Sequence, residues 1–337
     1  PKERVFVTVP RFKMGVPATL ATVVSDRYGN PILRPYPSWE VNNSNCSGLL
    51  SVMRIKISQC GHLWVLDTGR EDVLDTFKYL CPPKLRVYDL KTDEQIWEYI
   101  LPDGVLTNNS LMGTVELQGN CRKPFAYLAD IVGQGIVVVN TPAARSWRVE
   151  NGFTQADPTA STYNIDGETF HLDDGTISLA ATSTRVYFHS LSSFTENYVP
   201  VSVLTNEWNF QQPGDSVNQF HQYSGQRSGQ SGPAVIANSG RVMLFSNLPE
   251  NSLYCWRVDT SYEPRNFYQV FRNDVTFQFA SGMKVVRDRK NREYVLAVSS
   301  RFQDQINNHV NSQQVNYRIL YGAVDDLLAG KPCKAFF

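Results

Sequence analysis

The chain has 337 residues, of which 42% are hydrophobic and 19% charged, a composition typical of a folded protein with a sizeable core. Its 32 basic and 32 acidic residues cancel, so no global field recruits nucleic acid or an anionic membrane. No apolar run reaches the roughly 18 residues of a membrane span, and the first residues lack the pattern of a signal peptide. We expect no nucleic-acid or membrane partner, and any signal peptide already removed.

Short apolar runs rich in Tyr, Phe, Val and Thr, cut by Gly, Pro, Asn and Asp, predict an all-β protein. One unit recurs along the chain: a strand opened by a small residue and Gly, a polar turn, and a second strand that ends in small polar residues. A partial unit is VPATLATVV, and the full units contain SGLLSVMRI, MGTVEL, GTISLA, SGPAVI and SGMKVV, from Ser47, Met112, Gly175, Ser231 and Ser281. Their spacing of roughly fifty to sixty residues predicts one domain over residues 1–337, a six-bladed β-propeller. The only clear helix is expected at 324–328.

The six cysteines form no CxxC pair and have no His at zinc-finger spacing, which favours disulfides over a metal site. Disulfides indicate a secreted, extracellular protein. Three glycosylation sequons, at Asn42, Asn45 and Asn108, fall in polar stretches typical of loops. We therefore expect a secreted chain, with these three sequons as its possible glycosylation sites.

The positions of the cysteines around the predicted strands suggest how they pair. Two of them flank the HLWVLDTG strand and the loop after it, and two others precede or lead into strands of successive blades. The expected pairs are Cys60–Cys81, Cys46–Cys121 and, unless these two remain free, Cys255–Cys333.

A propeller has to hide the edges of its first and last strands. A strand at 5–9 (VFVTV) and one at 317–322 (YRILYG) are candidates to pair in one mixed blade. We expect this pairing to close the propeller.

Polar residues recur where the first strand of a unit begins and its second strand ends. In a propeller these two points lie at the same mouth, so we expect them to surround a central axial ligand pocket. The alternative is that each is an ordinary turn residue. The candidates are Ser47, Asp67, Thr68, Asp130, Asp174, Ser190, Ser246, Asn247, Ser281 and Ser300.

Several blocks resemble the yellow and major royal jelly protein family: VFVTVPRFKMGVPATLATV, SVMRIKISQCGHLWVLDTG, CPPKLRVYDLKT, QFASGMKVV and VNYRILYGAVDDLLAGKPC. Within that family the chain looks closest to the yellow-related salivary proteins of blood-feeding sand flies. The resemblance implies a six-bladed propeller and, in the salivary members, binding of biogenic amines such as serotonin.

The resemblance also implies a site. It places a hydroxyl on Ser281, a side-chain amide at position 300 and a backbone contact on Phe302. This sequence has Ser300 where the amide is expected, so one charge-assisted bond worth about 1.5–3 kcal/mol is weakened or absent.

An arylethylamine needs aromatic walls and acceptors for its ammonium. Phe302, Phe188 and Phe279 lie beside the strand ends, although Phe279 is more typical of core packing. A carboxylate from Asp67, Asp130 or Asp174 would offset the charge, with Asp67 in a DTG turn equally suited to holding backbone donors. The expected ligand residues are thus Ser281, Ser300, Phe302, Asp130, Asp67, Phe188 and Asn247.

The sequence contains no hydrolase, metalloprotease, phosphate-loop or dinucleotide motif. We expect no cofactor, no metal and no enzymatic activity, and a monomer that binds serotonin, catecholamines or histamine in saliva. One alternative is a dopachrome tautomerase, as some yellow-family members are, with His189 as the acid or base. Another is a structural or nutritive secreted protein without a tight ligand.

Overall fold

The computed structural model describes residues 4–43, 45–212 and 214–334. These residues group into two compact units, Pro1–Arg148 and Val149–Phe337. Strands dominate both, and the longest helix in the described part has five residues. None of the helices there is long and apolar enough to cross a membrane.

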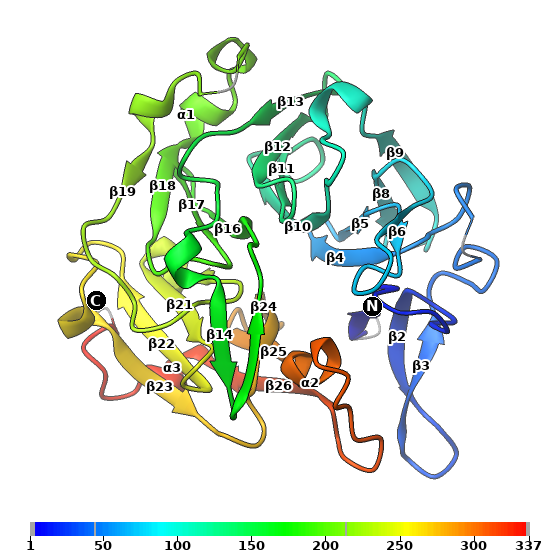
Figure 1. Ribbon diagram of the computed structural model, residues 1–337. Helices are drawn as coiled ribbons and strands as arrows, with labels where there is room; N and C mark the ends of the chain where they lie inside the picture. The colour runs from blue at the N-terminus through cyan, green and yellow to red at the C-terminus, as the bar shows by residue number, and fades with distance from the viewer. Residues whose placement is uncertain (1–3, 44, 213, 335–337) are drawn as a thin grey trace. The chain divides into compact units, whose positions relative to one another are not determined.

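The first unit contains three antiparallel sheets whose strands follow one another in chain order (Figure 1). A two-stranded hairpin, β6 (Arg70–Glu71) with β7 (Lys78–Tyr79), stands apart from them. The sheets are β1 (Phe6–Thr8), β2 (Leu20–Ser25) and β3 (Pro31–Pro35); β4 (Val52–Ile57), β5 (His62–Asp67), β8 (Lys84–Asp89) and β9 (Gln95–Ile100); and β10 (Met112–Gln118), β11 (Phe125–Asp130), β12 (Gly135–Asn140) and β13 (Arg145–Val149).

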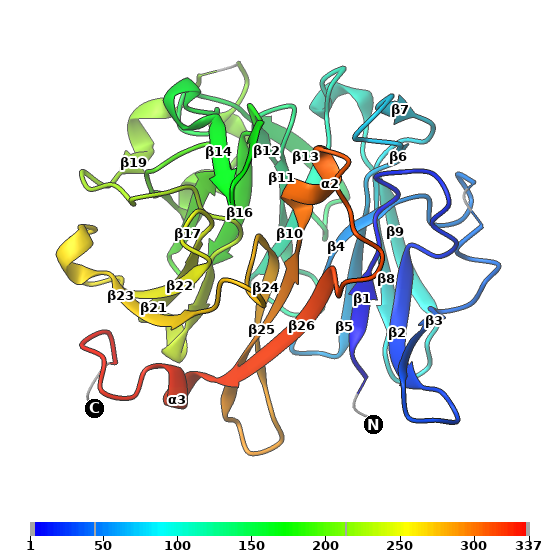
Figure 2. The same cartoon turned by 60° about the horizontal axis from the view of Figure 1, so that its bottom comes forward.

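The second unit also contains three such sheets, and β24, β25 and β26 run side by side in Figure 2. A separate hairpin pairs β14 (Thr162–Ile165) with β15 (Glu168–His171). The helices are α1 (Val201–Leu204), α2 (Phe302–Ile306) and α3 (Val324–Leu327). The sheets are β16 (Thr176–Ala181), β17 (Arg185–Ser190), β18 (Asn197–Pro200) and β19 (His221–Gln222); β20 (Val235–Ala237), β21 (Val242–Asn247), β22 (Ser252–Arg257) and β23 (Tyr268–Arg272); and β24 (Ala280–Arg287), β25 (Glu293–Ser300) and β26 (Tyr317–Ala323).

These six sheets are the blades of a six-bladed β-propeller, and the predicted fold class is confirmed. Each full repeat found in the sequence supplies the first two strands of a sheet, from β4 with β5 to β24 with β25, whereas the partial unit supplies β2, the middle strand of its sheet. The predicted helix is also present as α3, one residue shorter than expected. That all 337 residues form one domain, and that an axial pocket exists, stay predictions.

The first strand of four sheets is bulged near its start. The register shifts fall at Val52/Arg54, Met112/Thr114, Thr176/Ser178 and Ala280/Gly282. A bulge places one extra residue opposite a single partner and redirects its side chain. Ser281 is the bulged residue of β24, and it is the only one of the four that carries a hydroxyl.

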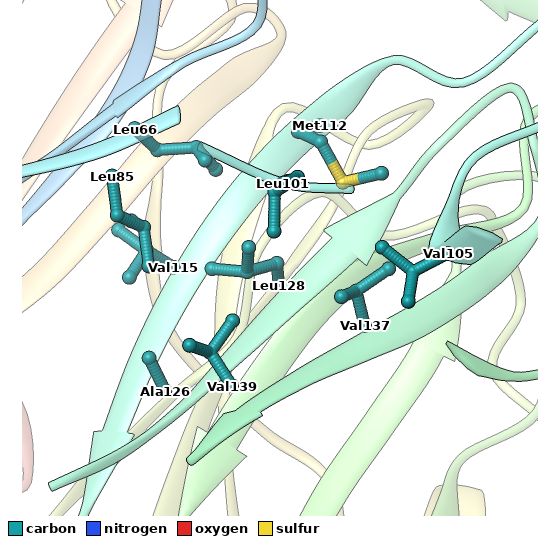
Figure 3. Packing of buried hydrophobic residues seen from close by; sticks show 10 residues of the cluster. All are labelled: Leu66, Leu85, Leu101, Val105, Met112, Val115, Ala126, Leu128, Val137 and Val139. Carbon is teal, nitrogen blue, oxygen red and sulfur yellow. The ribbon is translucent and has the colours of Figure 1, made fainter. Parts of the chain in front are cut away.

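Apolar side chains from neighbouring sheets form the core of each unit. In the first unit, one cluster joins β5 and β8 to the sheet of β10, β11 and β12, with Leu128 and Val137 fully buried at its centre (Figure 3). In the second, aromatic rings such as Tyr187 and Trp256 fill the space between sheets. Branched and aromatic residues on alternating strand positions account for both cores.

The disulfides are Cys46–Cys81, Cys60–Cys121 and Cys255–Cys333. The third pair was predicted; the pairs Cys60–Cys81 and Cys46–Cys121 are wrong. Cys60 lies in the turn after β4, whereas Cys81 lies before β8, at the opposite end of the same sheet. Strands of six residues separate these ends by about 20 Å, far beyond the reach of a disulfide. The three bridges indicate an extracellular protein.

The mixed blade is not formed either. Strand β1 pairs with β2, with Val7 opposite Ala21, while β26 pairs with β25 in a different sheet. The N-terminal strand thus pairs with the next strand along the chain, so closing the loop between them costs little entropy.

Candidate ligand site in the second unit

The end of the β24–β25 pair brings together two of the residues expected to bind a ligand. Ser281, in the bulge, donates from Oγ to the Val298 carbonyl over 3.3 Å. Ser300, at the end of β25, donates its backbone N–H to the Phe279 carbonyl over 3.2 Å. Because the strands are antiparallel, the start of β24 and the end of β25 coincide. The hydroxyls of Ser281 and Ser300 therefore belong to one end of this sheet.

Three phenylalanine rings gather at the same end. The Phe302 ring lies 4.7 Å from that of Phe279 and 6.3 Å from that of Phe170, centroid to centroid. Phe170 comes from β15 and stacks on Tyr163 of β14. Phe279 has a φ of 37°, a left-handed conformation that a bulky residue rarely adopts and that often marks a functional site. The rings of Phe170, Phe279 and Phe302 are called the phenylalanine group below.

Polar contacts hold the β14–β15 hairpin on this group. The Glu168 carboxylate accepts from Asn307 Nδ2 over 2.7 Å and lies 3.0 Å from His309 Nδ1. The bond from Asn307, followed by that from His309, holds the pKa of the Glu168 carboxyl below its usual range. Asp166, in the hairpin turn, accepts from Gln278 Nε2 over 2.7 Å. These bonds tie the hairpin to the segment after α2 and to the residue before Phe279.

Asp174 is a carboxylate whose oxygens have no hydrogen-bond partner among the described residues. It lies just before β16, and its backbone N–H donates to Ser192 Oγ, which also contacts the Tyr163 hydroxyl. Burial raises the pKa of the Asp174 carboxyl to about 7, with a smaller contribution from the charge of Asp173. Tyr163 stacks on Phe170, so a chain of contacts joins Asp174 to the phenylalanine group.

Asp67 and Asp130, in the first unit, serve the backbone instead. Asp67 accepts from the backbone N–H groups of Leu50 and Ser51 over 2.7 and 2.9 Å. Asp130 accepts from the Leu111 N–H over 2.7 Å and from Arg148 Nη1 over 2.8 Å. All four oxygens are engaged, and the alternative role as turn residues accounts for both.

This arrangement explains why polar residues recur at strand ends. In several sheets a side chain near the end of the second strand binds the backbone of the segment that leads into the first strand. Ser246 accepts from the Gly232 N–H, and Ser299 donates to the Gln278 carbonyl. We call this contact the blade clasp. Ser190 differs, because it donates to the Gln155 carbonyl, ahead of the β14–β15 hairpin. The recurrence expected to mark a pocket is therefore structural in several blades.

Two further predicted residues lie away from the phenylalanine group. Phe188 is fully buried and packs against Phe220 in the core. Asn247, at the end of β21, is also buried and donates from Nδ2 to Ser228 Oγ over 2.7 Å. The structure gives both a packing role.

His189 is fully buried, with acceptors at both ring nitrogens. Nδ1 lies 2.7 Å from Glu196 Oε2, and Nε2 lies 2.8 Å from the Gly232 carbonyl oxygen. Arg227 contacts the same Glu196 oxygen over 3.2 Å. A ring enclosed in this way has no free nitrogen with which to move a proton on a substrate. In the described residues no group of three or more His, Cys, Asp or Glu side chains is arranged to hold a metal ion.

The three sequons differ in exposure. Asn42 is buried, and its Nδ2 donates to the carbonyls of Tyr36 and Ser38, so the folded chain leaves no room for a glycan there. Asn45 and Asn108 are exposed. Their glycosylation stays a prediction.

Sequence reasoning missed Phe170, Gln278 and Gln303. Phe170 reaches the site from a hairpin more than 100 residues before Phe302 in the chain and no repeat contains it. Gln303 follows Phe302 directly, and its proximity to the predicted site was the only signal available.

The sequence of the chain is similar to proteins from flies and bees. The family model described as "Major royal jelly protein" matches residues 50–333. Dopaminechrome tautomerase of Drosophila melanogaster is 30% identical over 98% of this chain and 74% of that protein. Major royal jelly protein 9 of Apis mellifera is 30% identical over 98% and 80%, and protein yellow of Drosophila melanogaster 30% over 98% and 62%. The chain therefore belongs to the major royal jelly protein family.

Proposed function

We propose that this chain is a secreted, monomeric binding protein for small biogenic amines such as serotonin, and that its site is the end of the β24–β25 pair. The observation that carries the proposal is the phenylalanine group at the same end of the β24–β25 pair as Ser281 and Ser300. Catecholamines and histamine belong to the same ligand class.

The chemistry of an arylethylamine matches this group. Its flat ring needs aromatic walls, and each ring pair contributes about 0.5–1.5 kcal/mol beyond the buried area. Its ammonium needs oxygen acceptors and is attracted to the faces of aromatic rings. Hydroxyl and carbonyl oxygens at the strand ends supply the acceptors, and Phe302 supplies the ring face. Asp174, whose carboxylate contacts no cation among the described residues, adds a negative charge to the second unit.

The biological setting rests on the resemblance to the yellow-related salivary proteins of sand flies. An extracellular amine binder in saliva would sequester serotonin or histamine released where a blood-feeding insect bites. The three disulfides suit such a fluid.

Isothermal titration calorimetry with serotonin, histamine, dopamine and noradrenaline tests the proposal. We expect saturable heat with one amine per chain. Phe302→Ala should weaken binding by roughly 1–3 kcal/mol through the lost ring contact. The matched control is Tyr28→Ala, because Tyr28 is an exposed aromatic residue in the first unit, and it should leave affinity unchanged. No saturable heat with any amine would contradict the proposal and favour a structural or nutritive protein.

A second candidate function is tautomerase activity, favoured by the 30% identity to dopaminechrome tautomerase. His189 is enclosed, so the titratable group best suited to proton transfer is Asp174, whose pKa of about 7 lies near neutral pH. The test is to follow the loss of dopaminechrome by absorbance with the wild type and with Asp174→Asn. If neither the wild type nor the variant converts dopaminechrome, this candidate function is excluded.

A further inference from the structure

Two buried glutamine side chains form a hydrogen-bonded pair next to the phenylalanine group. Gln278 precedes Phe279, Gln303 follows Phe302, and the two side chains are 3% and 1% exposed. Gln303 Nε2 donates to Gln278 Oε1 over 2.9 Å. The pair therefore links the residues that carry two of the three rings.

The surroundings of Gln278 fix the orientation of both amides. Gln278 Nε2 donates to the Asp166 carboxylate over 2.7 Å and to the Asp274 carbonyl over 2.6 Å. Both partners accept only, so Nε2 of Gln278 has to face them and its Oε1 has to face Gln303. Gln303 must then turn its own Nε2 toward Gln278.

The oxygen of Gln303 is left without a donor. Oε1 is buried and has no hydrogen-bond partner among the described residues. A buried amide oxygen in this state is costly, and the protein holds it there through three hydrogen bonds made by the two glutamines. Such an atom is an acceptor already oriented for a donor that arrives from outside the chain.

We propose that Gln303 Oε1 accepts a hydrogen bond from the ammonium group of the bound amine. This inference rests on the proposed function and names the residue that distinguishes a cationic ligand from a neutral aromatic one. Helix α2 packs against β15, the strand that carries Phe170, so the ammonium at Oε1 places the ligand ring against the phenylalanine group.

The test compares tryptamine with 3-ethylindole, which has the same ring and two-carbon chain length but no ammonium. In the wild type we expect tryptamine to bind more tightly. Gln303→Met removes the acceptor and should reduce that preference by roughly tenfold to a hundredfold. Phe302→Ala should weaken both ligands and, because its ring also attracts the ammonium, reduce the preference less than Gln303→Met does. Thermal melting of each variant checks that it is folded.

Gln303→Glu keeps an oxygen acceptor at the same place and should retain or increase the preference for tryptamine. If Gln303→Glu lost the preference for tryptamine, the inference would be overturned even if Gln303→Met does not fold. Equal preference in the wild type and in Gln303→Met would also overturn it, while the proposed function would stand. If the wild-type protein bound no amine at all, both this inference and the proposed function would be refuted.

Discussion

The charge on Asp174 should make the stability of the protein depend on pH in an unusual direction. Its carboxyl is desolvated, lacks hydrogen bonds to stabilise the charged form, and lies near the Asp173 carboxylate. Replacing it by Asn keeps the size and removes the charge. We expect Asp174→Asn to stabilise the fold at pH 8 and to have little effect at pH 4.

The magnitude follows from the raised pKa. The folded value is about 7, against about 3.9 for an unfolded aspartate. Between these values the folded state holds one more proton than the unfolded state, so the free energy of unfolding falls as pH rises. Three pKa units correspond to about 4 kcal/mol. Asp174 is only half-buried, and we therefore expect a gain of about 1–4 kcal/mol at pH 8.

Urea unfolding of the wild type and the variant at both pH values measures this difference. Asp173→Asn is the comparison variant: it removes the smaller contribution to the raised pKa of Asp174, together with the charge that Ser161 and His171 stabilise on Asp173, and should give a smaller gain at pH 8. An equal effect of Asp174→Asn at pH 4 and pH 8 would refute the reasoning, because it would show that the variant acts through something other than the charge of Asp174.

Three further predictions concern the amine, the core and the disulfides. If Asp174 attracts the ammonium, amine affinity measured by calorimetry should fall as pH drops below about 7, and Asp174→Asn should abolish this dependence; a pH-independent wild type would contradict it. Leu128→Ala in the core of the first unit (Figure 3) should lower the free energy of unfolding by about 2–5 kcal/mol, and a loss below 1 kcal/mol would show that the cluster is loosely packed. Peptide mapping without reduction should yield a Cys60–Cys121 peptide, and a Cys60–Cys81 peptide would show that the pairing in the structure is wrong.

The repeat made the fold predictable from sequence. Each unit joins a strand, a turn and a second strand, and this local pattern fixes a sheet without knowledge of distant contacts. The order of the strands also determines which cysteines can pair. Strands alternate in direction, so Cys46 and Cys81 had to share one end of a sheet and Cys60 had to lie at the other.

The site was predictable only in part. The resemblance to the family placed Ser281, Ser300 and Phe302 in one site, and the structure has them at one end of the β24–β25 pair and at the start of α2. Phe170 was not predicted, because the hairpin that carries it lies outside the repeat and meets α2 only in the folded chain. Asp67 and Asp130 resembled ligand groups because the blade clasp uses the same residue types that bind cations.

The bridge between Cys255 and Cys333 bears on how the protein can be shortened. It fastens the segment after α3 to strand β22, in a different sheet from the β26 strand that precedes it. A version that stops before Cys333 would leave Cys255, which is fully buried in the intact fold, as a single thiol. That thiol would have no partner within the chain while folding proceeds in an oxidising compartment, where it can capture a cysteine of another molecule. Recombinant versions of this protein should therefore retain the C-terminal cysteine even when the residues after it are removed.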